Sequence, residues 1–150
     1  MTEANNLLCE GNDTGMFVTA FLAYYHLPTG RLTYSNGGHN PAWLFGPDGV
    51  CQESIYKHGP ALGVMPGLRY KEDADTLEAG QVLVIFTDGV TEACSPDDEL
   101  FGVDGFTKLV CNCESLKLSQ MFDRIDKDLK KFQQSNQFDD ITVLALKRKI

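Results

Sequence analysis

The sequence contains no apolar run that could cross a membrane. A membrane-spanning helix needs about 18 or more consecutive apolar residues, and no stretch of the 150-residue chain approaches that length. Residues 1–6 also lack the basic start and apolar centre of a secretion signal. We therefore expect a cytoplasmic domain that makes no membrane contact of its own.

Sulfur and nitrogen ligands in metal-binding spacing are also lacking. The five cysteines include no Cys-x-x-Cys pair, and the three histidines show no ligand spacing among themselves. This pattern argues against a zinc site or a redox pair. It favours reduced and mostly buried thiols.

Basic residues are in short supply. The chain has 13 Lys and Arg against 21 Asp and Glu, which gives a formal net charge of −8 at pH 7. Nucleic acids and anionic membranes bind surface patches of Lys and Arg. The charge balance therefore disfavours nucleic acid as a partner and suits a protein that binds cations.

What the chain does have is the composition of a soluble globular protein, with 43% hydrophobic and 23% charged residues. Its length is enough to bury a sizeable core, and it predicts one domain over residues 1–150. Residues 2–10 are compatible with a short helix. Aromatic and β-branched residues predict strands over 16–25 and 31–36, joined into a hairpin by a turn at 27–30.

The pattern after the hairpin predicts more strands and one long loop. Strands over 42–45 and 50–53, on either side of a Gly-Pro-Asp-Gly turn, would extend the hairpin into an antiparallel meander. Residues 57–67 are rich in glycine and proline and predict a crossing loop. Residues 68–76 are polar with isolated apolar positions, which is consistent with an exposed strand.

The last third of the chain predicts helices followed by a strand. A short helix is possible from residue 104 to residue 111, and residues 141–146 predict the final strand. The acids of the loop before the short helix are more consistent with a solvated loop than with ligands. An apolar stripe at helical spacing predicts an amphipathic helix that covers a sheet, and its members are Leu118, Met121, Phe122, Ile125, Leu129 and Phe132.

Residues 82–93 are the stretch around which the chain is organised. The run Val82 to Phe86 has no polar side chain, which predicts a strand buried on both faces. Asp88 follows at its tip, and Gly89 permits a turn there. Taken alone, the acid is explained as well by turn chemistry as by catalysis.

A second strand with carboxylates at one end favours a functional role for these acids over a role in a turn. Asp139 and Asp140 directly precede the largely apolar strand predicted over residues 141–146, so two strands each carry carboxylate at one end. Carboxylate oxygens select hard ions such as Mg²⁺ or Mn²⁺. Two such ions would activate water for hydrolysis of a phosphate ester. An aspartyl-phosphate enzyme is the rival hypothesis, but the position of its second acid is occupied by Val90.

Several ordered motifs resemble the bacterial stage II sporulation E-type serine phosphatases, a metal-dependent, protein phosphatase 2C-like family. The resemblance covers about residues 5–148. The matching segments, in chain order, are Gly15-Met-Phe-Val-Thr-Ala-Phe21, Leu32-Thr-Tyr-Ser-Asn-Gly-Gly-His-Asn-Pro41, Gly59-Pro-Ala-Leu-Gly63, Phe86-Thr-Asp-Gly-Val-Thr-Glu-Ala93, Phe101-Gly102 and Asp139-Asp-Ile-Thr-Val143.

The resemblance implies an α+β fold, an antiparallel β-sandwich flanked by helices, with Mg²⁺ or Mn²⁺ between the sheet ends. It implies that Asp88 and Asp139 are metal ligands, and Gly89 a weaker one. Asp140 and Thr87 would then act beside the ligands. It also implies a phosphoserine substrate on a regulatory protein such as an anti-sigma-factor antagonist.

The motif containing His39 and Asn40 recurs in the same family. A structural turn is the favoured interpretation of these two residues, and contact with substrate or with the metal ligands is the alternative.

The chain departs from the family pattern in one respect. The family also has an N-terminal half, whose Asp-Gly pair and Asp-x-x-Gly-x-Gly motif supply the bridging carboxylate, and no segment before Gly11 resembles it. We therefore expect a sandwich without its N-terminal strands, and at most one weakly bound ion. The alternative function is a non-catalytic interaction module, and self-association is compatible with both functions.

Overall fold

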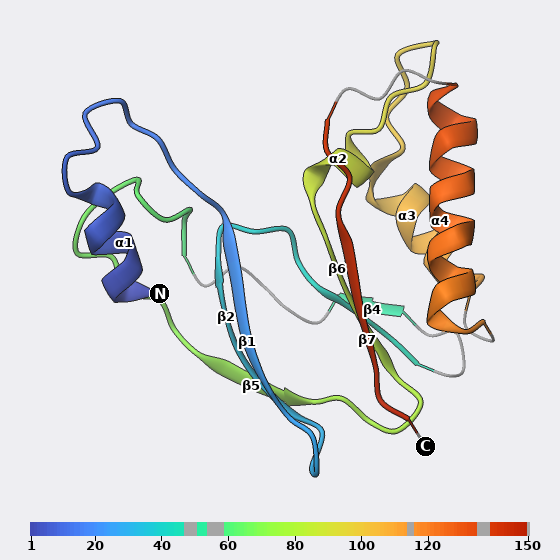
Figure 1. Cartoon of the computed structure of the whole chain (residues 1–150), viewed down its shortest axis with the longest axis horizontal. Coiled ribbons are helices and arrows are strands. Elements are labelled where there is room, and N and C mark those ends of the chain that lie inside the picture. The colour runs from blue at the N-terminus through green and yellow to red at the C-terminus, as the bar shows by residue number, and fades with distance from the viewer. Residues whose placement is uncertain (47–50, 54–58, 114–115, 135–138, 150) are drawn as a thin grey trace. The chain divides into compact units, whose positions relative to one another are not determined.

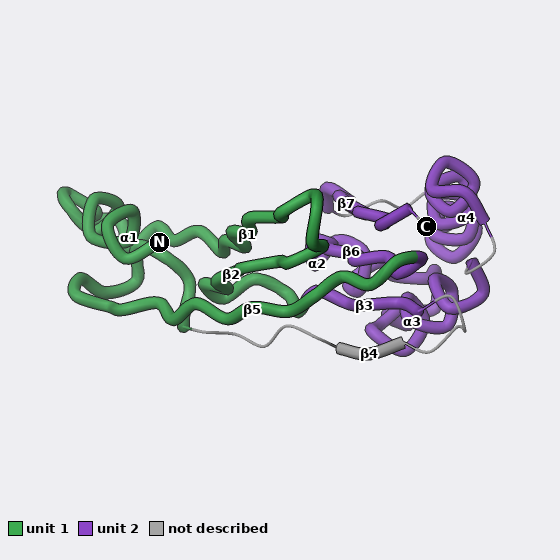
Figure 2. The backbone as a smooth tube through the Cα atoms, turned by 90° about the horizontal axis from the view of Figure 1, so that it is seen from below, with its two compact units in different colours: residues 1–41, 54–79 green, residues 42–53, 80–150 purple. Residues whose placement is uncertain are grey.

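The computed structural model describes residues 1–46, 51–53, 59–113, 116–134 and 139–149. The chain divides into two compact units, one formed by residues 1–41 and 54–79 and the other by residues 42–53 and 80–150 (Figure 2). In the part of the chain that the structure describes, no helix combines the length and apolar character needed to cross a membrane.

The first unit contains the predicted hairpin. Strands β1 (Ala20–His26) and β2 (Arg31–Gly37) pair antiparallel, and β5 (Asp73–Thr76) joins the other side of β2. Gly30 closes the hairpin turn with φ of 77°, a conformation that glycine adopts without strain. Strand β1 begins four residues later than the sequence predicted, because Val18 makes only an isolated bridge with Leu62.

Helix α1 (Thr2–Cys9) also belongs to this unit, and its polar side chains hold the glycine-rich loop. Asn5 is fully buried, accepts a hydrogen bond from the Gly63 amide (3.0 Å) and donates one to the Met65 carbonyl (2.9 Å). The predicted loop is therefore irregular but well tethered over its described residues, 59–67. Of the predicted exposed strand, only β5 forms.

The second unit is a four-stranded antiparallel sheet covered by helices. Its strand order is β4-β3-β6-β7, with bounds Cys51–Glu53, Trp43–Phe45, Val82–Phe86 and Val143–Lys147 respectively. Helices α2 (Asp88–Thr91), α3 (Gly102–Cys111) and α4 (Leu118–Gln133) complete the unit (Figure 1).

The predicted meander is wrong between β2 and β3. These strands belong to different sheets, and β3 pairs with β4 and β6. The physical reason lies in the connection, where Gly38 has φ of 73° and the Asn36 side chain closes a turn on His39. Both hairpins were predicted correctly. The prediction that one ladder continues through this turn was wrong.

The core of the second unit lies between its sheet and its helices. Val84 and Phe86 of β6 are buried, and the Phe86 ring packs against Phe106 of α3 with ring centroids 4.5 Å apart. Met121, Ile125 and Leu129 of α4 reach the same core, which confirms the predicted apolar stripe. On the other face of β6, Leu83 is buried but Ile85 is only half-buried.

Candidate metal-binding site

The two acidic motifs meet at one edge of the second unit's sheet, where strand β6 ends and strand β7 begins. Strands β6 and β7 pair antiparallel, with Phe86 opposite Val143 (Figure 1). The end of β6 and the beginning of β7 therefore lie side by side. This register brings the segment that carries Asp88 next to the segment that carries Asp139 and Asp140.

Thr87 joins these two segments directly. Its amide donates to the Thr142 carbonyl (3.0 Å), and its hydroxyl Oγ1 accepts a hydrogen bond from the Thr142 amide (3.0 Å). The same hydroxyl donates to the Asp140 carbonyl (3.2 Å). Thr87 thus extends the β6–β7 pairing beyond the last ladder residues.

Gly89 lies in a helix instead of the turn that the sequence predicted. Asp88 begins the short helix α2, in which the Glu92 amide donates to the Asp88 carbonyl (2.8 Å). A Cβ atom on Gly89 would lie 2.5 Å from the Asp140 carbonyl oxygen, closer than real Cβ contacts allow. The glycine is needed because α2 approaches the neighbouring backbone closely.

The donor chemistry of this edge fits a hard cation. Asp88 and Asp139 are both solvent-exposed, and the Asp139 Oδ1 accepts a hydrogen bond from the Asp140 amide (2.7 Å). Within the described residues, no three Asp, Glu, His or Cys side chains gather into a group that could hold a metal ion. Two carboxylates with water as the remaining ligands suit one Mg²⁺ or Mn²⁺ ion and do not suit a pair of ions.

His39 and Asn40 belong to the first unit, where their contacts are those of a turn. The His39 amide donates to Asn36 Oδ1 (2.9 Å), and Asn36 Nδ2 donates to the His39 carbonyl (3.1 Å). The His39 ring nitrogen Nδ1 lies 3.0 Å from the Asn40 carbonyl. These contacts support the favoured interpretation, and a role in substrate contact stays a prediction.

The remaining acidic candidates lie in an exposed loop. Asp97, Asp98 and Glu99 are solvent-exposed, and the Ser95 hydroxyl accepts hydrogen bonds from the amides of Asp97 (3.3 Å) and Glu99 (3.2 Å). This arrangement agrees with the predicted solvated loop.

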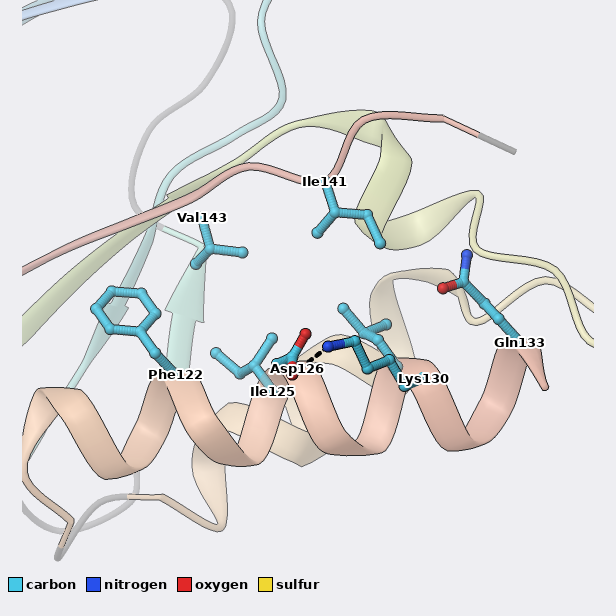
Figure 3. A pocket seen from close by; sticks show the side chains of 8 residues that line it. Phe122, Ile125, Asp126, Lys130, Gln133, Ile141 and Val143 are labelled. Atoms are coloured by element: carbon cyan, nitrogen blue, oxygen red, sulfur yellow. Dashed lines mark hydrogen bonds and ion pairs between the residues drawn. The ribbon is translucent and has the colours of Figure 1, made fainter. Parts of the chain in front are cut away.

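Sequence reasoning missed a groove beside this edge. Apolar side chains of α4 and of the residues around the start of β7 face each other across a space of about 390 Å³ (Figure 3). An ion pair between Lys130 Nζ and Asp126 Oδ2 (2.8 Å) lies on its rim. The sequence does not reveal the groove, because the apolar residues of α4 that line it belong to the same stripe that packs in the core.

The fold of the chain is shared with solved structures. Solved structures of the protein phosphatase 2C class superpose on the chain: the SiaA-PP2C domain of Pseudomonas aeruginosa has a TM-score of 0.78 at 19% identity, covering 93% of this chain and 55% of that one. The RsbU and RsbW domains of Rv1364c from Mycobacterium tuberculosis give 0.74 at 22% identity, covering 96% and 40%. The chain therefore has the α+β, protein phosphatase 2C-like fold that was predicted.

A family model described as stage II sporulation protein E (SpoIIE) matches residues 1–149. The chain belongs to this family, whose members are metal-dependent serine phosphatases of the protein phosphatase 2C type.

Two curated relatives agree with this assignment. Protein IcfG of Synechocystis is 34% identical over 140 residues, which are 93% of this chain and 22% of that protein. The phosphoserine phosphatase RsbU of Bacillus subtilis is 29% identical over 146 residues, or 97% and 43%. The chain spans less than half the length of either relative.

Proposed function

We propose that this chain is part of a metal-dependent serine/threonine phosphoprotein phosphatase, with Asp88 and Asp139 as ligands of Mg²⁺ or Mn²⁺. The observation that supports this most is the antiparallel pairing of β6 with β7, which puts both acidic motifs at one sheet edge. Family membership supports the class of reaction.

In this proposal each residue at the edge has a distinct task. The carboxylates of Asp88 and Asp139 supply the negative charge that holds a hard cation, and the Gly89 backbone is a weaker candidate ligand. Thr87 and the Asp140 backbone hold the two ligand-bearing segments together. When bound, the metal lowers the pKa of its water and neutralises phosphate charge. The substrate approaches from solvent, since both acids are exposed.

We propose a phosphoserine on a regulatory protein, such as an anti-sigma-factor antagonist, as the substrate. The relative RsbU is called a phosphoserine phosphatase, and one solved relative carries an RsbU domain and an RsbW domain in one protein. The net charge of −8 disfavours the approach of an anionic phosphoprotein, and a dication bound at the edge would offset this repulsion.

The test uses a chimera in which the corresponding N-terminal segment of the RsbU phosphatase region precedes residue 1. With Mn²⁺, the chimera should hydrolyse p-nitrophenyl phosphate and a phosphoserine peptide. Asp88→Asn and Asp139→Asn should each abolish hydrolysis and leave the circular dichroism spectrum unchanged, because an amide keeps the shape but removes the anion. Near-full activity in either variant would show that the ligand is wrongly assigned.

A non-catalytic interaction module is the second candidate, and it is favoured by exposed apolar surface in the first unit. Met16, Phe17 and Val18 are 72%, 66% and 47% exposed, beside an edge strand, β1. Such features favour association with another chain. Sedimentation of the 150-residue chain, compared with Phe17→Ser, would reveal self-association through this segment. A concentration-independent monomer would remove this support.

A further inference from the structure

We propose that Thr87 and Gly89 form a clamp that fixes the Asp88 segment against the Asp139 segment, and that this clamp sets the affinity of the edge for a divalent cation. The clamp is defined by Thr87, Gly89 and their contacts with residues 140–142. The inference rests on the proposed function. It adds positioning residues whose effect can be measured without enzymatic turnover.

The contacts of the clamp lie next to both acids in the sequence. Thr87 precedes Asp88 by one residue, and Asp140, whose carbonyl accepts the Thr87 hydroxyl at 3.2 Å, follows Asp139 by one. The Thr142 amide donates to the same hydroxyl at 3.0 Å, so a single side chain atom ties two backbone groups of the partner segment. A small movement of either segment would therefore be transmitted directly to an acid.

Gly89 supplies the second contact of the clamp. Its α-carbon faces the Asp140 carbonyl so closely that an added methyl would lie 2.5 Å from the oxygen and 3.1 Å from the carbonyl carbon. Both atoms belong to backbone, which cannot move aside as a flexible side chain end can. Alanine at this position would therefore push the Asp139–Asp140 segment away from α2.

The strand ladder cannot replace this clamp. Its last pair is Phe86 with Val143, followed by one backbone bond from the Thr87 amide to the Thr142 carbonyl, and both acids lie beyond this pairing with exposed side chains. Among the described residues no third acid, histidine or cysteine completes a metal-binding group. With only two carboxylates, affinity depends strongly on holding them at one separation, since groups that orient metal ligands typically change affinity about tenfold or more.

The test measures two quantities on the 150-residue chain by NMR. One is hydrogen exchange of the Thr142 amide without metal, and the other is Mn²⁺ affinity from paramagnetic broadening of the amides near Asp88 and Asp139. Thr87→Val keeps the side-chain shape but removes the hydroxyl. It should speed exchange at Thr142 and weaken Mn²⁺ binding about tenfold.

Matched variants separate positioning from general stability. Thr87→Ser restores the hydroxyl and should restore both readouts. Gly89→Ala should weaken Mn²⁺ binding, and this variant tests the clamp independently if Thr87→Val does not fold. Gly105→Ala is its control, because the nearest atoms to the added methyl are at 3.4 Å, an ordinary contact.

The outcomes distinguish this proposal from the proposed function. Mn²⁺ binding that Asp88→Asn abolishes but Thr87→Val and Gly89→Ala leave unchanged would overturn the clamp alone. Mn²⁺ binding that does not depend on Asp88 would overturn the metal site and the clamp together. Loss of Mn²⁺ affinity in Thr87→Val, together with its rescue in Thr87→Ser, would support both the metal site and the clamp.

Discussion

At the scale of single residues, two buried polar side chains of the first unit, Asn36 and Tyr34, are held by specific partners. Asn36 is fully buried and closes the turn on His39. Tyr34 is also buried, and its hydroxyl donates to Asp75 Oδ2 at 2.8 Å. Burial raises the pKa of Tyr34 above its ordinary value of 10.0, and the hydrogen bond to Asp75 raises this pKa further.

Tyr34→Phe should lower the free energy of unfolding by about 1 kcal/mol at pH 8, because the hydrogen bond to Asp75 is lost. The raised pKa means that the folded state keeps the phenol proton more tightly than the unfolded state. The contribution of Tyr34 is therefore fully present below pH 10.0 and is lost as the pH rises above that value.

Urea unfolding at pH 8 and at pH 11 checks this prediction. The difference between the wild type and Tyr34→Phe should narrow at the higher pH. Tyr24→Phe is the control, since Tyr24 of the same hairpin is 71% exposed and should have little effect at either pH. A difference that grows with pH would contradict the assigned direction of the shift.

At the scale of secondary-structure elements, β6 is buried unequally along its length. Val84 is fully buried in the core that α3 and α4 cover, whereas Ile85 is half-buried. The run of apolar residues predicted complete cover on both faces. Neighbouring residues of a strand point to opposite faces, so the cover of each face depends on what packs there.

Val84→Asp should unfold the second unit, because a charge in its core costs several kcal/mol. Ile85→Asp should be less damaging. Leu144→Asp is the matched control, since it puts the same charge on the adjacent strand β7 at a position that is 61% exposed. Thermal unfolding followed by circular dichroism ranks the three variants. A Val84→Asp protein that melts with the wild type would remove this account of the core.

At the scale of the whole molecule, charge and metal binding are linked. A chain with net charge −8 and three exposed acids at one edge, Asp88, Asp139 and Asp140, repels other anions and gains from a dication. We expect one weak site, with a dissociation constant of about 1 mM, since low-charge oxygen sites bind in that range.

Raising Mn²⁺ to about ten times that dissociation constant should stabilise the wild type by about 1.4 kcal/mol, because the ion binds only the folded state. Asp88→Asn should lose this stabilisation. Differential scanning calorimetry across a Mn²⁺ series gives the melting temperatures, and the same series with added NaCl controls for general ionic strength. Equal shifts in both proteins would place the bound ion elsewhere.

The sequence by itself determined the type and approximate place of most elements. The hairpin, the amphipathic α4 and the strand β6 follow from local periodicity, which a short window of residues already contains. The acidic motifs and their likeness to the phosphatase family were also visible without a structure. Gly89 was identified as special, although as a turn residue.

Tertiary structure decided which strands share a sheet and why Gly89 is a glycine. No local pattern distinguishes a turn that continues a ladder from one that leaves it, so β3 was wrongly placed beside β2. The need for Gly89 arises from Asp140, which is 51 positions away in the sequence and close only after β6 pairs with β7. Contacts of this kind depend on pairing between distant segments, and local composition does not encode them.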